Sequence, residues 1–201
     1  ENQMWDTLIT DECLEFLDGR DTEEPFFAYV GYRAPHPPWC APERFHAMYD
    51  PNHIGDLPNY NVRFTDKPRR VIERINYYEL WNLPEEMIRR SIAAYYGFVS
   101  YFDHCIGRII DGLEEKGLRE NTLIVYASDH GEMLGQFGMW WKCSLYEPSA
   151  RVPCIAAGPG FSVGARVRTP VDLHDMRAGL MAHLGVSQPD GWVGEPLQSV
   201  P

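Results

Sequence analysis

Apolar residues recur at steps of three and four along residues 92–113, and this spacing predicts one long helix with a single apolar stripe. Pro84 and the acidic pair after it suit the first turn of that helix, and Lys116-Gly117 suits its end. A shorter helix is expected over residues 8–17, and a last one over residues 172–184. The stripe of the long helix consists of Ile92, Tyr95, Val99, Phe102, Ile106, Ile109 and Leu113.

Three short, continuous apolar runs lack helical spacing and predict buried β-strands. They occupy residues 26–32, 122–127 and 152–157. Residues 39–84 show no sustained period and are expected to form a long connection over the surface. The alternation of helices and strands predicts an α/β sandwich with a largely parallel sheet, whose ligands lie beyond the carboxyl ends of the strands.

Composition and charge narrow the classes of function. The 201 residues can bury a core and fit one domain, or one domain with a short extension. A formal net charge of -11 argues against non-specific binding to nucleic acid, because phosphates attract a basic surface. No apolar run reaches the roughly 18 to 20 residues that span a bilayer, so no membrane span is expected. An anionic substrate would need cations placed locally at its site.

Neither a targeting signal nor a cysteine framework is predicted. The chain starts Glu1-Asn2-Gln3-Met4, without the basic start and apolar core of a secretory signal, so the sequence assigns no localisation. The cysteines number 5 and lack CxxC spacing, which argues against a full disulfide framework and against a zinc ribbon. Buried free thiols are the simpler interpretation.

Polar residues that can carry chemistry follow two of the predicted strands. Asp129 and His130 leave the strand at residues 122–127 and offer an oxygen and a nitrogen ligand to a divalent cation. The alternative is an Asx turn with a surface histidine. Lys142 would suit an anionic oxygen beside such a metal, although lysines are usually solvated surface charges. His36 follows the first predicted strand, and its alternative role is only to hold a loop between prolines.

Residues 128–135 read Ser-Asp-His-Gly-Glu-Met-Leu-Gly, and they are followed by Trp141-Lys142 and by Tyr-Glu-Pro-Ser-Ala-Arg-Val-Pro at residues 146–153. This run closely resembles the sulfatases of the alkaline phosphatase superfamily. Residues 29–38 and 101–108 are similar to two further segments of that family, in the same order along the chain.

The resemblance covers residues 10–197, to which residues 52–82 contribute least. It implies an alkaline-phosphatase-like α/β sandwich that is incomplete. Residues 1–201 are identified as a partial sulfatase-like catalytic domain, the C-terminal part of the main domain. A smaller C-terminal subdomain is expected to follow the segment at residues 191–197.

The resemblance also implies a role for each candidate residue. Asp129 and His130 would complete the site of a divalent cation, usually Ca²⁺, with Mn²⁺, Mg²⁺ and Zn²⁺ as alternatives. Lys142 would bind the sulfate or stabilise the leaving oxygen, and His36 would contact the same group. These roles make physical sense, because preorganised cations that face a transferring sulfuryl group lower the barrier electrostatically.

Part of the family's catalytic site is expected to be absent. Sulfatases supply two further metal-binding aspartates and a nucleophile in a Cys/Ser-x-Pro-x-Arg segment, whose cysteine becomes formylglycine, and both precede the segment of His36. Residues 1–25 contain neither. Cys40-Ala41-Pro42-Glu43-Arg44 matches the spelling, but we interpret the match as accidental. It falls on a variable position of the family, in a loop expected to lie away from any activating helix N-terminus.

The expected function is therefore part of a hydrolase that cleaves small anionic sulfate monoesters by a metal-assisted formylglycine mechanism, while the chain alone is expected to be inactive. The first alternative is a phosphate or phosphonate monoester hydrolase of the same superfamily. The second is a non-catalytic remnant that binds a partner, either a complementary chain or further copies of itself.

Overall fold

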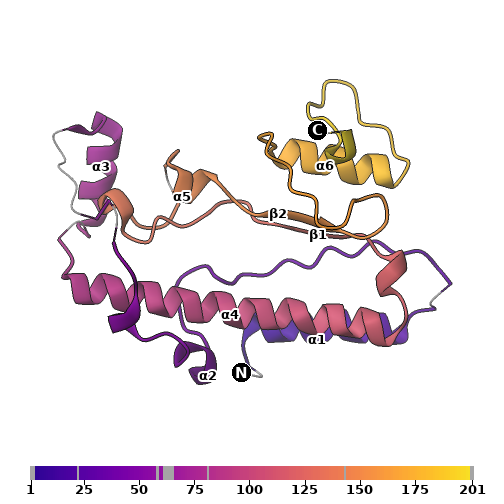
Figure 1. Ribbon diagram of the computed structural model, residues 1–201, viewed down its shortest axis with the longest axis horizontal. Coiled ribbons are helices and arrows are strands. Elements are labelled where there is room, and N and C mark those ends of the chain that lie inside the picture. The colour runs from indigo at the N-terminus through magenta and orange to yellow at the C-terminus, as the bar shows by residue number, and fades with distance from the viewer. Residues whose placement is uncertain are drawn as a thin grey trace. The chain divides into compact units, whose positions relative to one another are not determined.

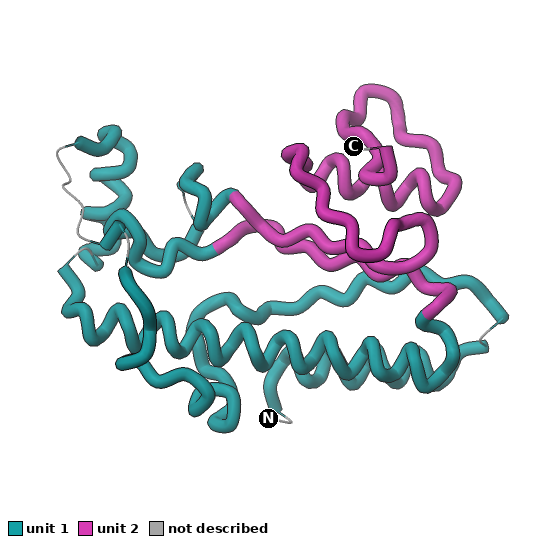
Figure 2. The backbone as a smooth tube through the Cα atoms, viewed as in Figure 1, with its two compact units in different colours: residues 1–119, 132–150 teal, residues 120–131, 151–201 magenta. Residues whose placement is uncertain are grey.

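The computed structural model describes residues 3–21, 23–57, 59–60, 66–80, 82–142 and 144–199. They fall into two compact units, one formed by residues 1–119 and 132–150 and the other by residues 120–131 and 151–201 (Figure 2). The elements are α1 (Trp5–Gly19), α2 (Glu43–His46), η1 (Pro51–His53), α3 (Arg69–Tyr78), α4 (Glu85–Glu115), η3 (Arg119–Asn121), β1 (Ile124–Ala127), η4 (Gln136–Gly138), α5 (Glu147–Ala150), β2 (Cys154–Ala157), α6 (Leu173–His183) and η5 (Leu197–Ser199) (Figure 1).

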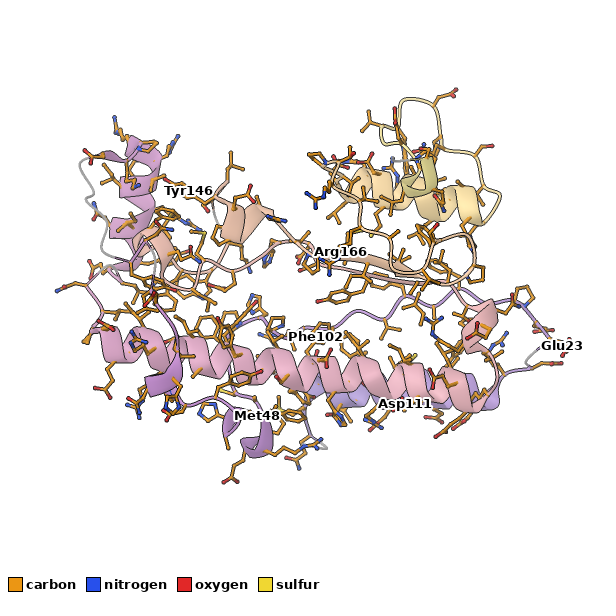
Figure 3. All side chains as sticks on the ribbon, in the orientation of Figure 1. Glu23, Met48, Phe102, Asp111, Tyr146 and Arg166 are labelled. Carbon is orange, nitrogen blue, oxygen red and sulfur yellow. The ribbon has the colours of Figure 1, made fainter. Side chains whose placement is uncertain are left out.

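The core of the first unit lies between α1 and α4, which run side by side (Figure 1). Both helices confirm the sequence prediction. Along α4 the predicted stripe is buried at Phe102, while Asp111 is exposed (Figure 3). Tyr101 is fully buried, and its hydroxyl lies 2.7 Å from the hydroxyl of Thr7 on α1. Gly112 allows the close approach of the helices, because a Cβ there would lie 2.6 Å from a methyl group of Leu14.

The first predicted strand, at residues 26–32, is wrong. The segment is extended, but among the described residues no strand pairs with it. Tyr32 packs on Phe102 with ring centroids 5.1 Å apart, whereas the side chains of Phe27 and Tyr29 are 65% and 88% exposed. A strand needs a hydrogen-bonded neighbour, whereas the ring contacts of this segment are with Phe16 of α1 and Phe102 of α4.

The second unit contains β1, β2 and α6. The two strands confirm the predicted positions, but they pair antiparallel, with Ile124 opposite Ala157, so the predicted parallel arrangement is wrong for them. A parallel pair needs a crossover connection, usually a helix, and the described residues between β1 and β2 form only the short η4 and α5. The strands are also less buried than predicted, since Ile155 is 57% exposed.

The last predicted helix is confirmed as α6, and its first turn is strongly specified. The side chain of Asp172 accepts hydrogen bonds from the backbone N–H groups of His174 at 2.7 Å and Asp175 at 3.2 Å. The Asp175 side chain in turn accepts from the backbone of Asp172 at 2.9 Å, which completes a capping box. The bonds that its carboxylate accepts from the backbone of His174 and Asp175 lower the pKa of Asp172.

The connection over residues 39–84 is more ordered than the sequence suggests. It contains α2, η1 and α3, and α3 buries Ile75, which is 3% exposed. The helical signal was present in the spacing of Val71, Ile75 and Tyr78, directly after Pro68, but charged residues between them hid it. None of the helices in the described ranges is long and apolar enough to cross a membrane.

Candidate functional site

His36 lies in a loop that a buried carboxylate of α1 holds in place. Asp6 is only 2% exposed, and its Oδ1 accepts hydrogen bonds from the backbone N–H groups of Arg33 at 2.7 Å and Ala34 at 3.1 Å. The backbone N–H of His36 then donates to the carbonyl of Arg33 at 2.9 Å. The position of His36 therefore depends on the packing of α1.

Lys142 ends a loop that a second carboxylate organises. Oε1 of Glu132 accepts from the backbone N–H groups of Leu134 at 3.0 Å and Trp141 at 2.7 Å. The N–H of Met133 donates to the carbonyl of Trp141 at 2.8 Å, which closes the loop. Trp141 has a φ of 63°, a left-handed conformation that a large side chain adopts only where its surroundings enforce it. Glu132 thus fixes the backbone immediately before Lys142.

These two loops bring His36 and Lys142 together, although they are 106 residues apart in the sequence. Nζ of Lys142 lies 3.0 Å from Nε2 of His36, and Nδ1 of His36 lies 2.7 Å from the carbonyl oxygen of Pro37. A carbonyl can only accept, so Nδ1 carries the hydrogen and Nε2 accepts from the ammonium. Within the described ranges no other partner of the ammonium is found, which leaves two N–H donors that could bind an anionic oxygen.

Asp129 and His130 lie just after the end of β1, in the second unit. Oδ1 of Asp129 accepts from the backbone N–H of His130 at 3.0 Å, and Nδ1 of His130 donates to the carbonyl of Gly131 at 2.9 Å. The other ring nitrogen, Nε2, lies 3.5 Å from Oδ2 of Asp129. This contact with the next residue differs from an Asx turn, in which the side chain accepts from the N–H two residues on. It leaves Oδ2 of Asp129 and Nε2 of His130 facing each other.

This oxygen and nitrogen fit a divalent cation as part of its ligand set. Two ligands at right angles on a cation with bonds of about 2.3 to 2.6 Å lie about 3.3 to 3.7 Å apart. A histidine that binds metal also usually donates its other N–H to an oxygen, as His130 does to Gly131. Calcium takes about six to eight ligands, and within the described ranges no three His, Cys, Asp or Glu side chains gather as a metal site.

Two residues of this arrangement were missed by the sequence analysis. In the sequence Glu132 is only one member of the segment that resembles the family. Its side chain accepts from Leu134 and Trp141, and no sequence pattern predicts that these two N–H groups share one acceptor. Asp6 carries no sequence signal, since an acidic residue in the first turn of a helix is ordinary. Its burial, which reveals the role, is a property of the fold alone.

Cys40 lies in a loop, as expected, and its thiol is exposed. Helix α2 begins three residues after it, at Glu43, so the expectation that Cys40 lies away from an activating helix N-terminus stays a prediction. That helix has only 4 residues, so its dipole is small. The expectation of buried thiols holds for Cys105, whereas Cys154 is exposed.

Comparison with known proteins places these observations in one family. The family model described as Sulfatase matches residues 1–186. The chain is 34% identical over 171 residues to a choline-sulfatase of Rhizobium meliloti (strain 1021), in a match that covers 83% of the chain and 33% of that relative. It is 31% identical over 210 residues to an arylsulfatase of Clostridium perfringens (strain 13 / Type A), covering all of the chain and 42% of the relative.

The fold is also similar to that of a solved phosphonate monoester hydrolase from Silicibacter pomeroyi. The TM-score is 0.85 and the identity 28%, with 98% of this chain and 41% of that chain covered. The chain thus spans between a third and a half of the length of the proteins it matches. By the family match over residues 1–186, the chain belongs to the sulfatase family of the alkaline phosphatase superfamily.

Proposed function

We propose that the whole protein hydrolyses sulfate monoesters and that Lys142 holds the sulfuryl oxygens or the leaving oxygen. His36 acts on the same group through Lys142, whose ammonium it orients, because both of its ring nitrogens are already engaged. The observation that carries the proposal is the 3.0 Å contact between Lys142 Nζ and His36 Nε2. A transferring sulfuryl group spreads negative charge over its oxygens, and a preorganised ammonium stabilises that charge. Family membership supplies the reaction class.

The contact assigns a separate task to each partner. His36 accepts one N–H of the Lys142 ammonium, so the direction of the two remaining N–H groups is fixed. One of these can bind a sulfuryl oxygen, and the other can bind or protonate the leaving oxygen. Because the ammonium is oriented before substrate arrives, little reorganisation is needed during the reaction.

We propose Asp129 and His130 as two of the ligands of a divalent cation, with calcium as the first choice and manganese, magnesium and zinc as alternatives. The contact between His130 Nδ1 and the Gly131 carbonyl leaves Nε2 as the ligating atom. When bound, the cation would supply Lewis-acid stabilisation of negative oxygens. The other ligands and a formylglycine nucleophile are proposed to come from parts of the protein outside residues 1–201, and the chain alone is proposed to be inactive.

A phosphate or phosphonate monoester hydrolase is the second candidate. The fold similarity to a phosphonate monoester hydrolase, with a TM-score of 0.85, favours it. The same ammonium suits phosphoryl and sulfuryl oxygens, since both groups place negative charge on equatorial oxygens in the transition state. The ratio of kcat/KM for matched aryl sulfate and aryl phosphonate esters separates the two functions.

A partner chain, either complementary or a second copy, is a further proposal. Residues 26–32 are extended without a paired strand among the described residues, and Phe27 and Tyr29 are exposed there. An extended segment of this kind can accept a strand from another chain. Size-exclusion chromatography of residues 1–201, alone and mixed with the rest of the protein, tests this proposal.

The decisive experiment measures sulfate ester turnover by the whole protein with Lys142→Ala. Loss of one oriented donor is expected to lower kcat by roughly 10²- to 10³-fold. Lys116→Ala is the matched control, because Lys116 is paired with Asp18 at the end of α4 and is expected to leave kcat unchanged. Equal kcat in the two variants would overturn the role of Lys142.

A further inference from the structure

Two residues from the segment that resembles the family least hold the loop over residues 132–142. The hydroxyl of Tyr60 donates to the carbonyl of Leu134 at 2.7 Å, and the carbonyl of Asn59 accepts from the backbone N–H of Phe137 at 2.8 Å. The first of these contacts joins residues that are 74 apart in the sequence. The loop is therefore anchored from a part of the chain that the family motifs do not include.

The two contacts fall on strained positions of the loop. Leu134 and Phe137 have left-handed backbones, with φ of 49° and 55°. A residue other than glycine adopts this conformation only where its surroundings enforce it. Trp141, which is also left-handed, is held by Glu132 from within the loop, whereas the other two are held by residues 59–60. Residues 59–60 therefore stabilise a backbone that the sequence of the loop itself disfavours.

Leu134 connects this anchor to Lys142. Its carbonyl accepts from Tyr60, and its N–H donates to Oε1 of Glu132 at 3.0 Å. The same oxygen accepts from the N–H of Trp141 at 2.7 Å, and Trp141 directly precedes Lys142. If Leu134 left the left-handed region, its N–H and C=O groups could not keep both bonds. The backbone before Lys142 would then lose part of its support.

The ring of Tyr60 packs where the two loops of the candidate site meet. A Cβ at Gly135 would lie 2.9 Å from Cε1 of Tyr60 and 3.0 Å from Cζ2 of Trp140, so both rings pack on this glycine. Trp140 is 6% exposed, and its ring centroid is 6.0 Å from that of Trp39. Nε1 of Trp39 donates to the carbonyl of Pro35 at 3.0 Å, in the other loop. The packing around Tyr60 therefore reaches both loops.

We propose that Tyr60 is a positioning residue, which holds Leu134 and thereby directs the ammonium of Lys142 towards the sulfuryl or leaving oxygen. The inference rests on the proposed function, which assigns that oxygen to Lys142. Tyr60 acts on the oxygen only through the loop. Its contribution is expected to appear in the rate, because a misplacement of about 1 Å can cost roughly 10²-fold. The segment that resembles the family least thus adjusts a lysine that the family motif supplies.

The test measures kcat and KM of the whole protein with phenyl sulfate. Tyr60→Phe removes one hydroxyl and keeps the ring. It is expected to lower kcat roughly fivefold with little change in KM, because the misdirected ammonium matters most in the transition state. Tyr49→Phe is the matched control, because the Tyr49 hydroxyl also bonds a residue distant in the sequence, Ser100, at 2.8 Å. This control is expected to keep full kcat.

A second variant tests whether Tyr60 acts by holding Leu134 in its left-handed conformation. Asparagine adopts that conformation more readily than leucine, so Leu134→Asn is expected to depend less on Tyr60. In the Leu134→Asn background, Tyr60→Phe should lower kcat by roughly twofold or less. An equally large loss in both backgrounds would contradict the inference.

A measurement without turnover separates this inference from the proposed function. The ¹⁵N resonance of His36 Nε2 reports the hydrogen bond that this atom accepts from Lys142. Tyr60→Phe is expected to move the resonance towards its position in Lys142→Ala, and Tyr49→Phe to leave it in place. An unmoved resonance in Tyr60→Phe, or a kcat equal to that of Tyr49→Phe while Lys142→Ala is impaired, would overturn the inference. A moved resonance together with full kcat in Lys142→Ala would overturn the proposed function instead.

Discussion

The His36–Lys142 pair and the Asp129–His130 pair are stabilised in different ways. The first joins residues 106 apart, and each of its loops is held by a carboxylate, Asp6 of α1 in one case and Glu132 of the loop itself in the other. The second joins neighbours in the sequence, and its hydrogen bonds among the described residues stay between Ser128 and Gly131. Mutations that disturb the fold of the first unit should therefore break the contact between His36 and Lys142. Metal binding by Asp129 and His130 should depend instead on further ligands to the cation.

The largest effect is expected from Asp6, which supports the loop of His36. Asp6→Ala leaves the backbone N–H groups of Arg33 and Ala34 without their acceptor in a buried place, at a cost of about 2 to 4 kcal/mol in the free energy of unfolding. Denaturant unfolding measures this change. The control is Asp11→Ala on the same helix, since Asp11 forms a half-exposed ion pair with Arg108 worth about 1 kcal/mol or less.

The same variant separates the two pairs. Asp6→Ala is expected to lower sulfate ester turnover of the whole protein while leaving its calcium affinity unchanged. If both quantities fall together, the two pairs share one support, and the contrast between them is wrong.

The next largest effect is expected from calcium binding at Asp129 and His130. Calcium at 100 times its Kd is expected to stabilise the whole protein by about 2.7 kcal/mol, and to leave the unfolding of residues 1–201 alone unchanged. Asp129→Ala should abolish the stabilisation, and Asp111→Ala, at an exposed position of α4, should preserve it. Stabilisation of the isolated chain by calcium would show that the pair already belongs to a full site.

The contrast between local and long-range determinants also explains which helices and strands could be predicted from the sequence. The helix over residues 92–113 was predictable, because its burial repeats with the period of the helix itself. The prediction of a strand at residues 26–32 failed, because a strand is completed by neighbours that its own sequence does not specify. The orientation of β1 relative to β2 was missed for the same reason.

The candidate site divides along the same line. Short segments that resemble the family identified four candidate residues: His36, Lys142, Asp129 and His130. Such segments specify both the type of residue and its spacing. The contact between the first two could not be predicted, since it depends on the burial of Asp6 and the two backbone bonds of Glu132.

Glu132 gives a smaller and more specific test of the long-range pair. Glu132→Ala removes the acceptor of the Leu134 and Trp141 N–H groups, and is expected to cost about 1 to 2 kcal/mol and to lower kcat by displacing Lys142. Glu132→Gln keeps an acceptor oxygen. Its losses in the free energy of unfolding and in kcat are expected to be less than half of those in Glu132→Ala. A variant that is destabilised yet keeps full kcat would limit Glu132 to a structural role.

The smallest effect is an alkaline loss of stability that should act on the His36–Lys142 pair alone. Burial raises the pKa of Tyr32 and of Tyr60 to about 12 from an ordinary value of 10.0. The Tyr32 hydroxyl lies 2.9 Å from that of Thr10 on α1, and the Tyr60 hydroxyl donates to the carbonyl of Leu134 at 2.7 Å. One tyrosine thus supports the chain before His36, and the other supports the loop of Lys142.

The sign follows from the direction of the shift. A pKa that is higher in the folded state means that the unfolded chain loses its proton first, so this stability is complete below pH 10 and declines as the pH rises towards 12. Urea midpoints measured between pH 8 and pH 11.5 should fall less steeply in Tyr32→Phe and Tyr60→Phe than in the unmodified chain. Tyr29→Phe is the control, because that ring is 88% exposed. An equal slope in all three variants would mean that neither tyrosine links the loops to pH, and the greater sensitivity of the His36–Lys142 pair would then rest on the two carboxylates alone.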